Sequence, residues 1–283
     1  MRLLVTGASS FVGAHFCVRA SVKHEIVALH HSTPLQLNGV TPVKADLRSR
    51  RDVAKVGSLD FDAVVHLATK VKGARALDTN RALMDAVLGF GKPIVYASST
   101  VVHWSSPSPY RESRREDEAR LADSGLPYAT VRPSAPYGPR LVNHSPGHKE
   151  SFHTLAEWVR RSRLVPVIGD GEYRRQPLHV DDFSDSMLAL LERGLPNQGF
   201  DAGGEQAMTM NEIVACIAGA MNRRVRPMHL PKALFVQIAR VAPDFDPDLI
   251  AAVDEDEVAD KQLLEEATGV RFRPFSEGVK CLL

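Results

Sequence analysis

The 283-residue sequence has few cysteines, few aromatic residues and almost no net charge. Its three cysteines, Cys17, Cys216 and Cys281, are scattered and form no CxxC pair. This pattern argues against a disulfide framework and a zinc ribbon, and it is typical of a reducing, cytoplasmic compartment. The 35 basic and 34 acidic residues leave a formal charge of +1. We therefore expect neither nucleic acid nor a membrane as a partner, because both attract a basic excess.

A long hydrophobic run is also absent. Residues 3–5 are apolar, but Thr6 and Gly7 follow at once, so we expect no secretory signal peptide. The longest later apolar stretch, 233–242, is interrupted by Gln237 and Arg240 and is too short to span a bilayer. Hydrophobic residues make up 44% of the chain and charged residues 24%, as in an ordinary globular protein. The sequence thus predicts a soluble protein.

Short apolar runs alternate with helix-length segments through the first two thirds of the chain. The predicted strands are 3–5, 26–29, 63–67, 94–97 and 130–131, and the predicted helices are 12–21, 78–90 and 109–124. Nearly continuous apolar strands separated by helices are typical of a parallel sheet that helices cover on both faces. The right-handed crossover rule then predicts an α/β fold with a doubly wound parallel (Rossmann) sheet.

Proline and glycine become frequent at 133–147, where the character of the chain changes. A helix is expected at 152–163, and a strand–helix unit at 178–192 is expected to return to the sheet. We expect residues 1–140 and about 177–200 to form the sheet core. Residues of about 141–176 and 201–283 are then expected to form a small interleaved C-terminal cap that binds the substrate.

A glycine-containing turn, TGASSFVG at 6–13, follows the first predicted strand and opens the first helix. Such a turn lets backbone N–H groups and a helix N-terminus meet a pyrophosphate, and its glycines permit close approach. Gly7 and Gly13 keep the outer glycines of the GxxGxxG pattern, but Ser10 replaces the middle one. Its position at the first strand–helix junction favours a dinucleotide site over an ordinary loop.

Further short motifs follow this turn in a fixed order. They are ADL at 45–47, HLA at 66–68, Asn80, RPSAPYGP at 132–139, GDG at 169–171 with Arg175, HVDD at 179–182, DAGG at 201–204 and TMNE at 209–212. The succession resembles the extended short-chain dehydrogenase/reductase superfamily, the NAD(P)-dependent sugar epimerases and dehydratases. The resemblance implies NAD or NADP as cofactor, a carbohydrate and foremost a nucleotide sugar as substrate, and a homodimer.

The resemblance also implies which residues hold the cofactor. They are Gly7, Ser9, Ser10, Phe11, Val12, Gly13, His30, His31, Asp46, Leu47, Leu67, Ala68, Thr69, Asn80, Tyr110, Arg114 and Pro133. The second strand ends in His30 and His31, with neither an acid for a ribose 2′-hydroxyl nor an arginine. Two histidines slightly favour the 2′-phosphate of NADP, but a solvated loop explains them equally well. The choice between NAD and NADP stays open.

Hydride transfer to or from a carbinol needs a group that takes the hydroxyl proton. Among the five tyrosines only Tyr110 has a cation one helical turn on, Arg114. Taken alone, the pair is better explained as a tyrosine on a charged helix surface. However, PYRESR at 109–114 resembles the PYxxSK motif, and ASSTVV at 97–102 resembles the strand end that carries the catalytic serine. The resemblance implies that Tyr110 is the acid/base, that Arg114 lowers its pKa and holds the ribose, and that Ser99 orients the substrate oxygen.

Three departures from this pattern leave a second hypothesis open. Arg114 stands where the family has lysine, and its planar fork cannot donate to two ribose hydroxyls as an ammonium does. Only eleven positions separate Ser99 from Tyr110, and His103-Trp104 replaces Tyr-Gly. The alternative to an enzyme is therefore a non-catalytic dinucleotide-binding regulator or accessory subunit.

The substrate-facing residues are predicted to be Ser99, Thr100, His103 and Arg175. Arg175 matches the arginine that grips the diphosphate in sugar-nucleotide enzymes, since a guanidinium suits phosphate. An ion pair of Arg175 with Asp181 or Asp182 is the structural alternative.

Three histidines, His144, His148 and His153, could suggest a metal site by their spacing. A Pro-Gly pair between the first two breaks any common helical face, and no acid or thiolate cluster accompanies them. We therefore expect no metal. The polar loop 143–150, which holds the first two, lies where a lid over the substrate would lie.

Overall fold

A seven-stranded parallel sheet forms the centre of the computed structural model, which describes residues 1–73, 75–141, 144, 151–241 and 252–283. Its strands are β1 (Arg2–Thr6), β2 (Glu25–His30), β3 (Thr41–Lys44), β4 (Ala63–His66), β5 (Ile94–Ala97), β6 (Tyr128–Pro133) and β11 (Gln198–Ala202). They lie in the order β11-β6-β5-β4-β1-β2-β3. The order reverses between β1 and β4, as in a doubly wound fold. The predicted α/β Rossmann class is confirmed.

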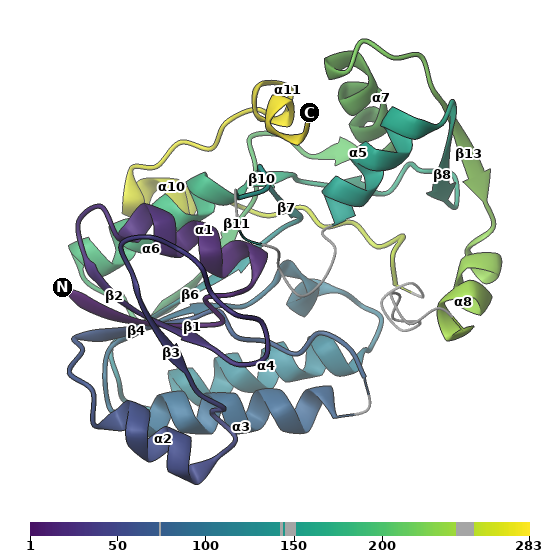
Figure 1. Cartoon of the computed structure of the whole chain (residues 1–283). Coiled ribbons are helices and arrows are strands. Elements are labelled where there is room, and N and C mark those ends of the chain that lie inside the picture. Colours follow the sequence, from purple (N-terminus) through teal and green to yellow (C-terminus); the bar gives the residue numbers. More distant parts are fainter. Residues whose placement is uncertain (74, 142–143, 145–150, 242–251) are drawn as a thin grey trace.

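Helices cover both faces of this sheet (Figure 1). On one face lie α1 (Phe11–Ala20), α6 (Val180–Arg193) and α10 (Gln262–Thr268), and on the other lie α2 (Arg50–Gly57), α3 (Ala76–Gly89) and α4 (Pro109–Ala122). Alternate residues of each strand serve the two faces: Leu3 and Val5 pack with Phe16, whereas Leu4 packs with Met84. β1, β2, β4 and β5 are apolar at nearly every position because both of their faces are buried.

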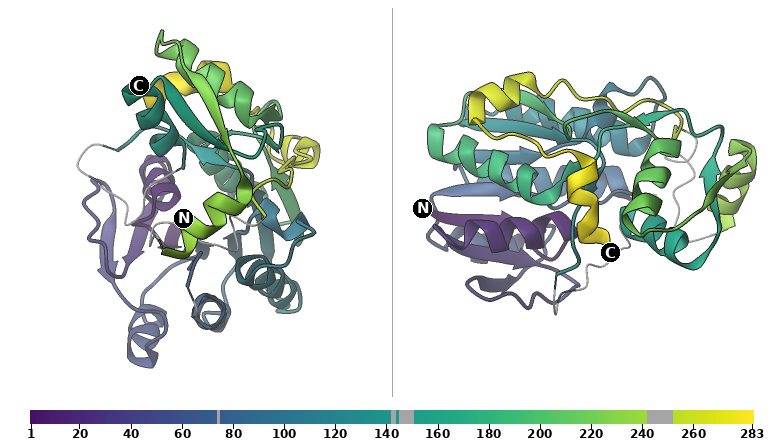
Figure 2. Two further views of the ribbon diagram at one scale, coloured as in Figure 1. Left: turned by 90° about the vertical axis from the view of Figure 1, so that its right-hand side faces the viewer. Right: turned by 90° about the horizontal axis from the view of Figure 1, so that it is seen from above.

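η1 (Thr100–His103) follows β5 and contacts α4. The remaining elements form a smaller lobe beside the sheet. They are β7 (Pro136–Tyr137), α5 (Ser151–Arg161), β8 (Leu164–Ile168), β9 (Arg174–Arg175), β10 (Leu178–His179), β12 (Met208–Thr209), α7 (Met210–Ala220), β13 (Arg226–Leu230), α8 (Lys232–Val241), α11 (Phe275–Gly278) and η2 (Val279–Leu282). The view from above shows α5, α7, β8 and β13 at the end of the molecule away from the N-terminus (Figure 2). Val159, Val167, Ile213 and Ile217 belong to the core of this lobe.

The structure differs from the sequence prediction in several elements. The predicted unit at 178–192 supplies α6 to the sheet, but β10 pairs with β7 in a separate two-stranded sheet. The edge strand β3, the helix α2 and the seventh strand β11 were missed. Leu264 and Phe272 share one buried cluster with Leu3, so part of the expected cap packs on the sheet. The division into core and cap otherwise stays a prediction.

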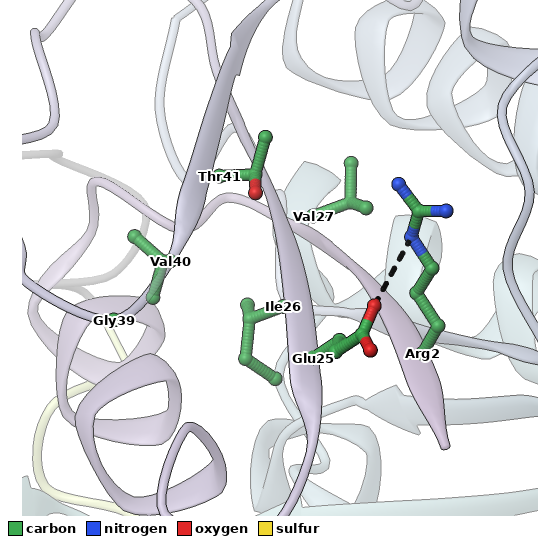
Figure 3. A pocket seen from close by; sticks show the side chains of 7 residues that line it. All are labelled: Arg2, Glu25, Ile26, Val27, Gly39, Val40 and Thr41. Atoms are coloured by element: carbon green, nitrogen blue, oxygen red, sulfur yellow. Dashed lines mark ion pairs between the residues drawn. The ribbon is translucent and has the colours of Figure 1, made fainter.

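A hollow of about 340 Å³ opens at the amino ends of β1, β2 and β3 (Figure 3). The ion pair between Arg2 and Glu25, with Nε and Oε2 3.9 Å apart, crosses its mouth. Doubly wound sheets bind their ligands at the carboxyl ends of the strands. This hollow is therefore not the candidate site. Among the described helices, none is both long enough and apolar enough to cross a membrane.

Candidate functional site

The turn between β1 and α1 leaves no space for side chains at its two glycines. Gly7 has a φ of +68°, and a Cβ there would lie 2.6 Å from the backbone nitrogen of Ala68. A Cβ on Gly13 would lie 2.1 Å from the carbonyl oxygen of Gly7. Ser10, at the missing middle glycine, has an ordinary φ of −76° and caps α1, because its Oγ accepts a 3.0 Å hydrogen bond from the Gly13 amide. The serine thus preserves the turn without a third glycine.

The hydroxyl of Thr6 fixes the end of β1 to the end of β4. Its oxygen accepts hydrogen bonds of 3.2 Å from the amides of Leu67 and Ala68, and it lies 2.7 Å from Nδ1 of His66. Burial and, to a lesser degree, the charge of Arg114 lower the pKa of His66 to about 3. The imidazole is therefore neutral at physiological pH. The hydrogen bonds of Thr6 thus hold the ends of β1 and β4 together at the topological switch point.

Several donors around this turn fit a dinucleotide. At the start of α1 the amides of Phe11 and Val12 donate to no group among the described residues, and a helix N-terminus favours an anion. Ser9 lies half-buried beside them, and its carbonyl oxygen is 3.2 Å from Nε2 of His144. At the end of β2, Nδ1 of His30 is buried and has no partner in the described chain. These open donors and the glycine cradle suit the pyrophosphate and the adenosine half of such a cofactor.

A small charged cluster lies next to the end of β2. Arg48 donates to the carboxylate of Asp46 through Nε at 2.9 Å and Nη2 at 2.8 Å, and His31 lies 3.6 Å from the same carboxylate. The hydrogen bond from Arg48 holds the pKa of Asp46 at about 2. Leu47 is buried beneath this cluster. Arg48 was missed in the sequence, although it stands only two residues after the predicted adenine contact.

The other predicted cofactor residues lie along the carboxyl edge of the sheet. Leu67, Ala68 and Thr69 follow β4, and Pro133 ends β6. Asn80 on α3 is 1% exposed and sits behind them. Its Oδ1 accepts from the amide of Lys70, and its Nδ2 donates to the carbonyl of Lys70 and to Oγ of Ser113. Asn80 therefore ties the loop after β4 to α4.

Two of the predicted catalytic residues, Ser99 and Tyr110, both contact the segment that follows β5. Ser99 caps η1, and its Oγ accepts a 3.4 Å hydrogen bond from the amide of Val101. Tyr110, the second residue of α4, packs against Val101, Trp104 and Ala252. The hydroxyl of Ser99 and the ring of Tyr110 are thus both anchored on Val101. Ala252 comes from the C-terminal part of the chain and could not be assigned to the site from the sequence.

Arg114 is buried rather than exposed in the cleft, with 1% of its surface accessible. Its Nη2 donates to Oδ2 of Asp117 at 2.9 Å and lies 3.4 Å from Oγ of Ser113. Its Cζ lies 5.4 Å from the ring centres of both Tyr96 and Tyr110. The hydroxyl of Tyr96 donates to the same Asp117 carboxylate at 3.1 Å. Burial raises the pKa of Asp117 to about 6, against the opposing effects of Arg114 and Tyr96.

Buried donors without partners concentrate in this region. Six buried side-chain atoms of the described residues have no hydrogen-bond partner, and four of them lie between the end of β5 and the first turns of α4. These four are Ser98 Oγ, Trp104 Nε1, Arg111 Nε and Arg114 Nε. Because native proteins leave few such groups unpaired, their concentration beside Ser99 and Tyr110 marks a site for a polar ligand.

The predicted substrate residues on η1 differ in exposure. Thr100 is 2% exposed, and its Oγ1 donates to the carbonyl of Pro133 at 3.3 Å, which joins β5 to β6. His103 is exposed over half of its side chain, and its Nε2 lies 2.9 Å from Oδ2 of Asp201. Hydrogen bonds from His103 and Arg132 outweigh the effect of burial and lower the pKa of Asp201.

Arg175 is 8% exposed and is held by protein oxygens. Its Nη1 donates to the carbonyls of Arg174 and Glu255 at 2.9 and 2.7 Å, and its Nη2 donates to the carbonyl of Val253 at 2.5 Å. Its Nε lies 3.7 Å from the carboxylate of Glu257. The segment around residues 253–257 therefore occupies most of its donors.

The alternative pairing of Arg175 with Asp181 or Asp182 is wrong. Asp182 accepts several hydrogen bonds from Arg273, including one of 3.0 Å from its Nε. Asp181 lies 3.2 Å from Nδ1 of His15. Both carboxylates are thus paired with other residues on the α1 side of the molecule.

The described part of the chain contains no group of three or more His, Cys, Asp or Glu side chains that could hold a metal ion. Nε2 of His153 lies 2.8 Å from the carbonyl oxygen of Gly138. His144 contacts the turn between β1 and α1 (residues 7–10, the phosphate turn) through the carbonyl oxygen of Ser9. His148 and most of the predicted lid 143–150 lie outside the described residues.

A doubly wound sheet with a glycine turn at its switch point defines a dinucleotide-binding α/β protein. The chain matches the NAD dependent epimerase/dehydratase family over residues 3–121 and 108–203, and it belongs to this family. It is 28% identical over 315 residues to dTDP-4-dehydro-6-deoxy-D-allose reductase from a Streptomyces species, covering 88% of this chain and 93% of that protein. It is 25% identical over 328 residues to ADP-L-glycero-D-manno-heptose-6-epimerase of Pseudomonas aeruginosa, covering 99% and 97%.

Solved structures confirm the fold. UDP-glucose 4-epimerase from Thermotoga maritima, determined with UDP-glucose, superposes with a TM-score of 0.81 at 20% identity and covers 100% of this chain and 97% of that chain. The enzyme from Bifidobacterium longum, in complex with NAD+ and UDP, gives a TM-score of 0.82 at 16% identity, with the same coverage. The homodimer that the resemblance implies stays a prediction.

Proposed function

We propose that this protein is an NAD(P)-dependent enzyme that oxidises or reduces a carbinol or carbonyl carbon of a carbohydrate, with Tyr110 as the acid/base. The observation that carries the proposal is a group of three buried, unpartnered polar atoms in the segment that holds Ser99 and Tyr110: Ser98 Oγ, Trp104 Nε1 and Arg111 Nε. The named relatives, which act on dTDP- and ADP-linked sugars, make a nucleotide sugar the proposed substrate class.

The residues at the site suit proton transfer. When bound, the nicotinamide supplies or accepts the hydride. The Oγ of Ser99 already accepts a hydrogen bond from the Val101 amide, so its own proton is free to be donated to a substrate oxygen. During oxidation the phenolate of Tyr110 takes the proton of a substrate carbinol, and during reduction its phenol hydroxyl returns that proton. Trp104 and Ala252 pack on the Tyr110 ring and limit the access of water.

Arg175 remains the proposed contact of the substrate diphosphate. A guanidinium binds phosphate with two parallel hydrogen bonds. Its present acceptors, the carbonyls of Val253 and Glu255, are the groups that phosphate oxygens would replace. Substrate binding is therefore expected to displace this segment from Arg175.

NADP is the favoured cofactor, through His31 and Arg48. His31 is exposed after the end of β2, and both His31 and Arg48 contact the carboxylate of Asp46. Two basic groups near this strand end would bind a 2′-phosphate. We expect NADPH to bind about tenfold more tightly than NADH, and the double substitution His31→Ala/Arg48→Ala to remove a difference of about 1.4 kcal/mol. Equal Kd values for the two cofactors in the wild type would refute this preference.

The proposed function is tested with a panel of dTDP-, UDP- and ADP-sugars and their 4-keto forms, each with NAD(H) and NADP(H). Turnover is followed by the absorbance of the reduced nicotinamide and by chromatography of the sugar. Tyr110→Phe is expected to lower kcat by about 10²–10⁴-fold and to leave the Kd of the dinucleotide unchanged. Tyr128→Phe, on β6 and outside the site, is the matched control.

Two results would contradict the proposal. Unchanged turnover in Tyr110→Phe would remove the tyrosine from the mechanism. Dinucleotide binding without turnover of any sugar in the panel would favour the non-catalytic regulator instead.

A further inference from the structure

The position of Arg114 differs from what its motif implies. Because only 1% of its surface is exposed, Arg114 cannot donate a hydrogen bond to a bound ligand without moving. Its Nη2 is instead bonded to Asp117, one turn further along α4, and its Nε has no partner among the described residues. The cation therefore faces the interior between α4 and β5.

Asp117 is the residue that fixes this orientation. It is 1% exposed and receives two donors on the same oxygen, Oδ2: Nη2 of Arg114 at 2.9 Å and the hydroxyl of Tyr96 at 3.1 Å. The guanidinium lies 5.4 Å from the ring centre of Tyr110 on one side and 5.4 Å from that of Tyr96 on the other. A planar cation at this distance from two aromatic rings is held as a cation–π partner.

We propose that Asp117 is a positioning residue for the acid/base Tyr110: braced by Tyr96, it holds the Arg114 guanidinium against the Tyr110 ring and away from the ribose of a bound dinucleotide. The inference rests on the proposed function, because it takes Tyr110 as the acid/base. It divides the two roles of the family's lysine, since the charge beside the tyrosine is kept and the ribose contact is lost.

The other titratable groups around the guanidinium are few. On α4 they are Tyr110, Asp117 and Glu118, on β5 Tyr96, and on β4 His66. His66 is neutral, as shown above. The groups packed on Tyr110 from η1 and from the C-terminal part of the chain are apolar. Arg114 and Asp117 form a buried charged pair with the guanidinium on the Tyr110 ring. A second ion pair, between Arg111 and Glu112, follows Tyr110 directly in the chain.

The test follows the ionisation of Tyr110 in the full-length protein, by the absorbance of tyrosinate as the pH is raised, taking the difference from Tyr110→Phe. Asp117→Asn keeps the shape of the side chain and an oxygen acceptor but removes the negative charge. We expect Tyr110 to ionise about one pH unit higher in this variant, because the charge that holds the Arg114 guanidinium against the Tyr110 ring is lost. The double variant Arg114→Met/Asp117→Asn removes both charges, and we expect Tyr110 to ionise about one pH unit higher than in the wild type.

Glu116→Gln is the matched control. Glu116 stands next to Asp117 on α4 but pairs with Arg81 on α3, with Oε1 2.6 Å from Nε. We expect this variant to leave the ionisation of Tyr110 in place. The Kd values of NADH and NADPH are measured for all variants by nicotinamide fluorescence, and we expect them to stay within about twofold of the wild type.

Three results would overturn the inference. They are an unchanged ionisation of Tyr110 in both Asp117 variants, a shift to lower pH in Asp117→Asn, or a loss of dinucleotide affinity of tenfold or more in the double variant. The last result would mean that Arg114 reaches the cofactor. If Asp117→Asn fails to fold, the double variant still decides the question, because a neutral pair leaves no buried charge unpaired. No measurement here needs turnover, so the inference can stand or fail separately from the proposed function.

Discussion

The substitution Gly13→Ala tests whether the phosphate turn is as tightly packed as the structure shows. Gly13 lies in the first turn of α1, where alanine would ordinarily be the better residue. A Cβ at this position would lie 2.1 Å from the carbonyl oxygen of Gly7 and 2.9 Å from Cα of Ala8. Both contacts are with backbone atoms, which cannot rotate away as a side chain can. The turn itself must therefore open.

Two effects of opposite sign determine the magnitude. Replacing glycine by alanine inside an unobstructed helix stabilises a protein by about 0.5–1 kcal/mol, whereas forcing an extra methyl group into a packed site costs about 1–3 kcal/mol. At Gly13 the clash is with backbone, so the cost exceeds the gain, and we expect a net loss of about 1–2 kcal/mol in the free energy of unfolding. Opening the turn also separates the amides that would bind the pyrophosphate. The affinity for NADPH should therefore fall by more than about tenfold, or 1.4 kcal/mol.

Gly219→Ala is the matched control, because Gly219 is also helical, on α7, but a Cβ there would meet nothing within 4 Å. We expect this variant to be more stable than the wild type by about 0.5–1 kcal/mol, with unchanged cofactor affinity. Urea unfolding and a fluorescence titration with NADPH measure both quantities. The reasoning is refuted if Gly13→Ala gains as much stability as Gly219→Ala or binds the cofactor like the wild type.

The remaining predictions concern a half-buried carboxylate and a buried thiol. Glu255 accepts hydrogen bonds from the amides of Ser105 and Ser106, which outweigh the effect of burial and lower its pKa from 4.5 to about 2. Since the folded-state value is the lower one, the stabilisation is present above pH 4.5 and is lost as the pH falls toward 2. We expect Glu255→Gln to be less stable than the wild type by about 1.5–3 kcal/mol at neutral pH. In urea unfolding this difference should shrink to zero as the pH falls from 4.5 toward 2. A stability difference that does not depend on pH would contradict the prediction. Burial raises the pKa of the Cys17 thiol to about 12. Alkylation followed by peptide mapping should therefore find Cys17 unmodified in the native protein, whereas the half-buried Cys216 should be labelled first. Equal labelling rates for the two cysteines would show that α1 opens in solution.

How much of the fold was predictable depends on burial. The strands β1, β2, β4 and β5 are covered on both faces, so their apolar runs identify them without any tertiary information. The edge strand β3, with the sequence TPVK, is mostly exposed and carries no such run. β11 contains Gly199 and Asp201, and it becomes a strand through its register with β6, which the local sequence does not reveal. β3 was therefore missed because it is exposed and lacks an apolar run, and β11 because its partner β6 lies far away in the chain.

The site shows the same limit more sharply. Local motifs located Gly7, Gly13, Ser99 and Tyr110, because the chemistry of each depends on its immediate backbone. They could not predict the direction of an arginine, since this depends on which acceptor the fold brings to it.

Arg114 donates a hydrogen bond to Asp117, three residues on, and its guanidinium lies over the ring of Tyr96 on β5. Arg175 donates to the carbonyls of Val253 and Glu255, about 80 residues away in the chain. Both guanidiniums therefore donate to acceptors on the protein itself. In a chain with a formal charge of +1, no overall field replaces the attraction for an anionic ligand that these two paired guanidiniums give up. The electrostatics at the site are consequently set by individual pairs, and the replacement of lysine by arginine at position 114 can be interpreted only together with the aspartate that holds it.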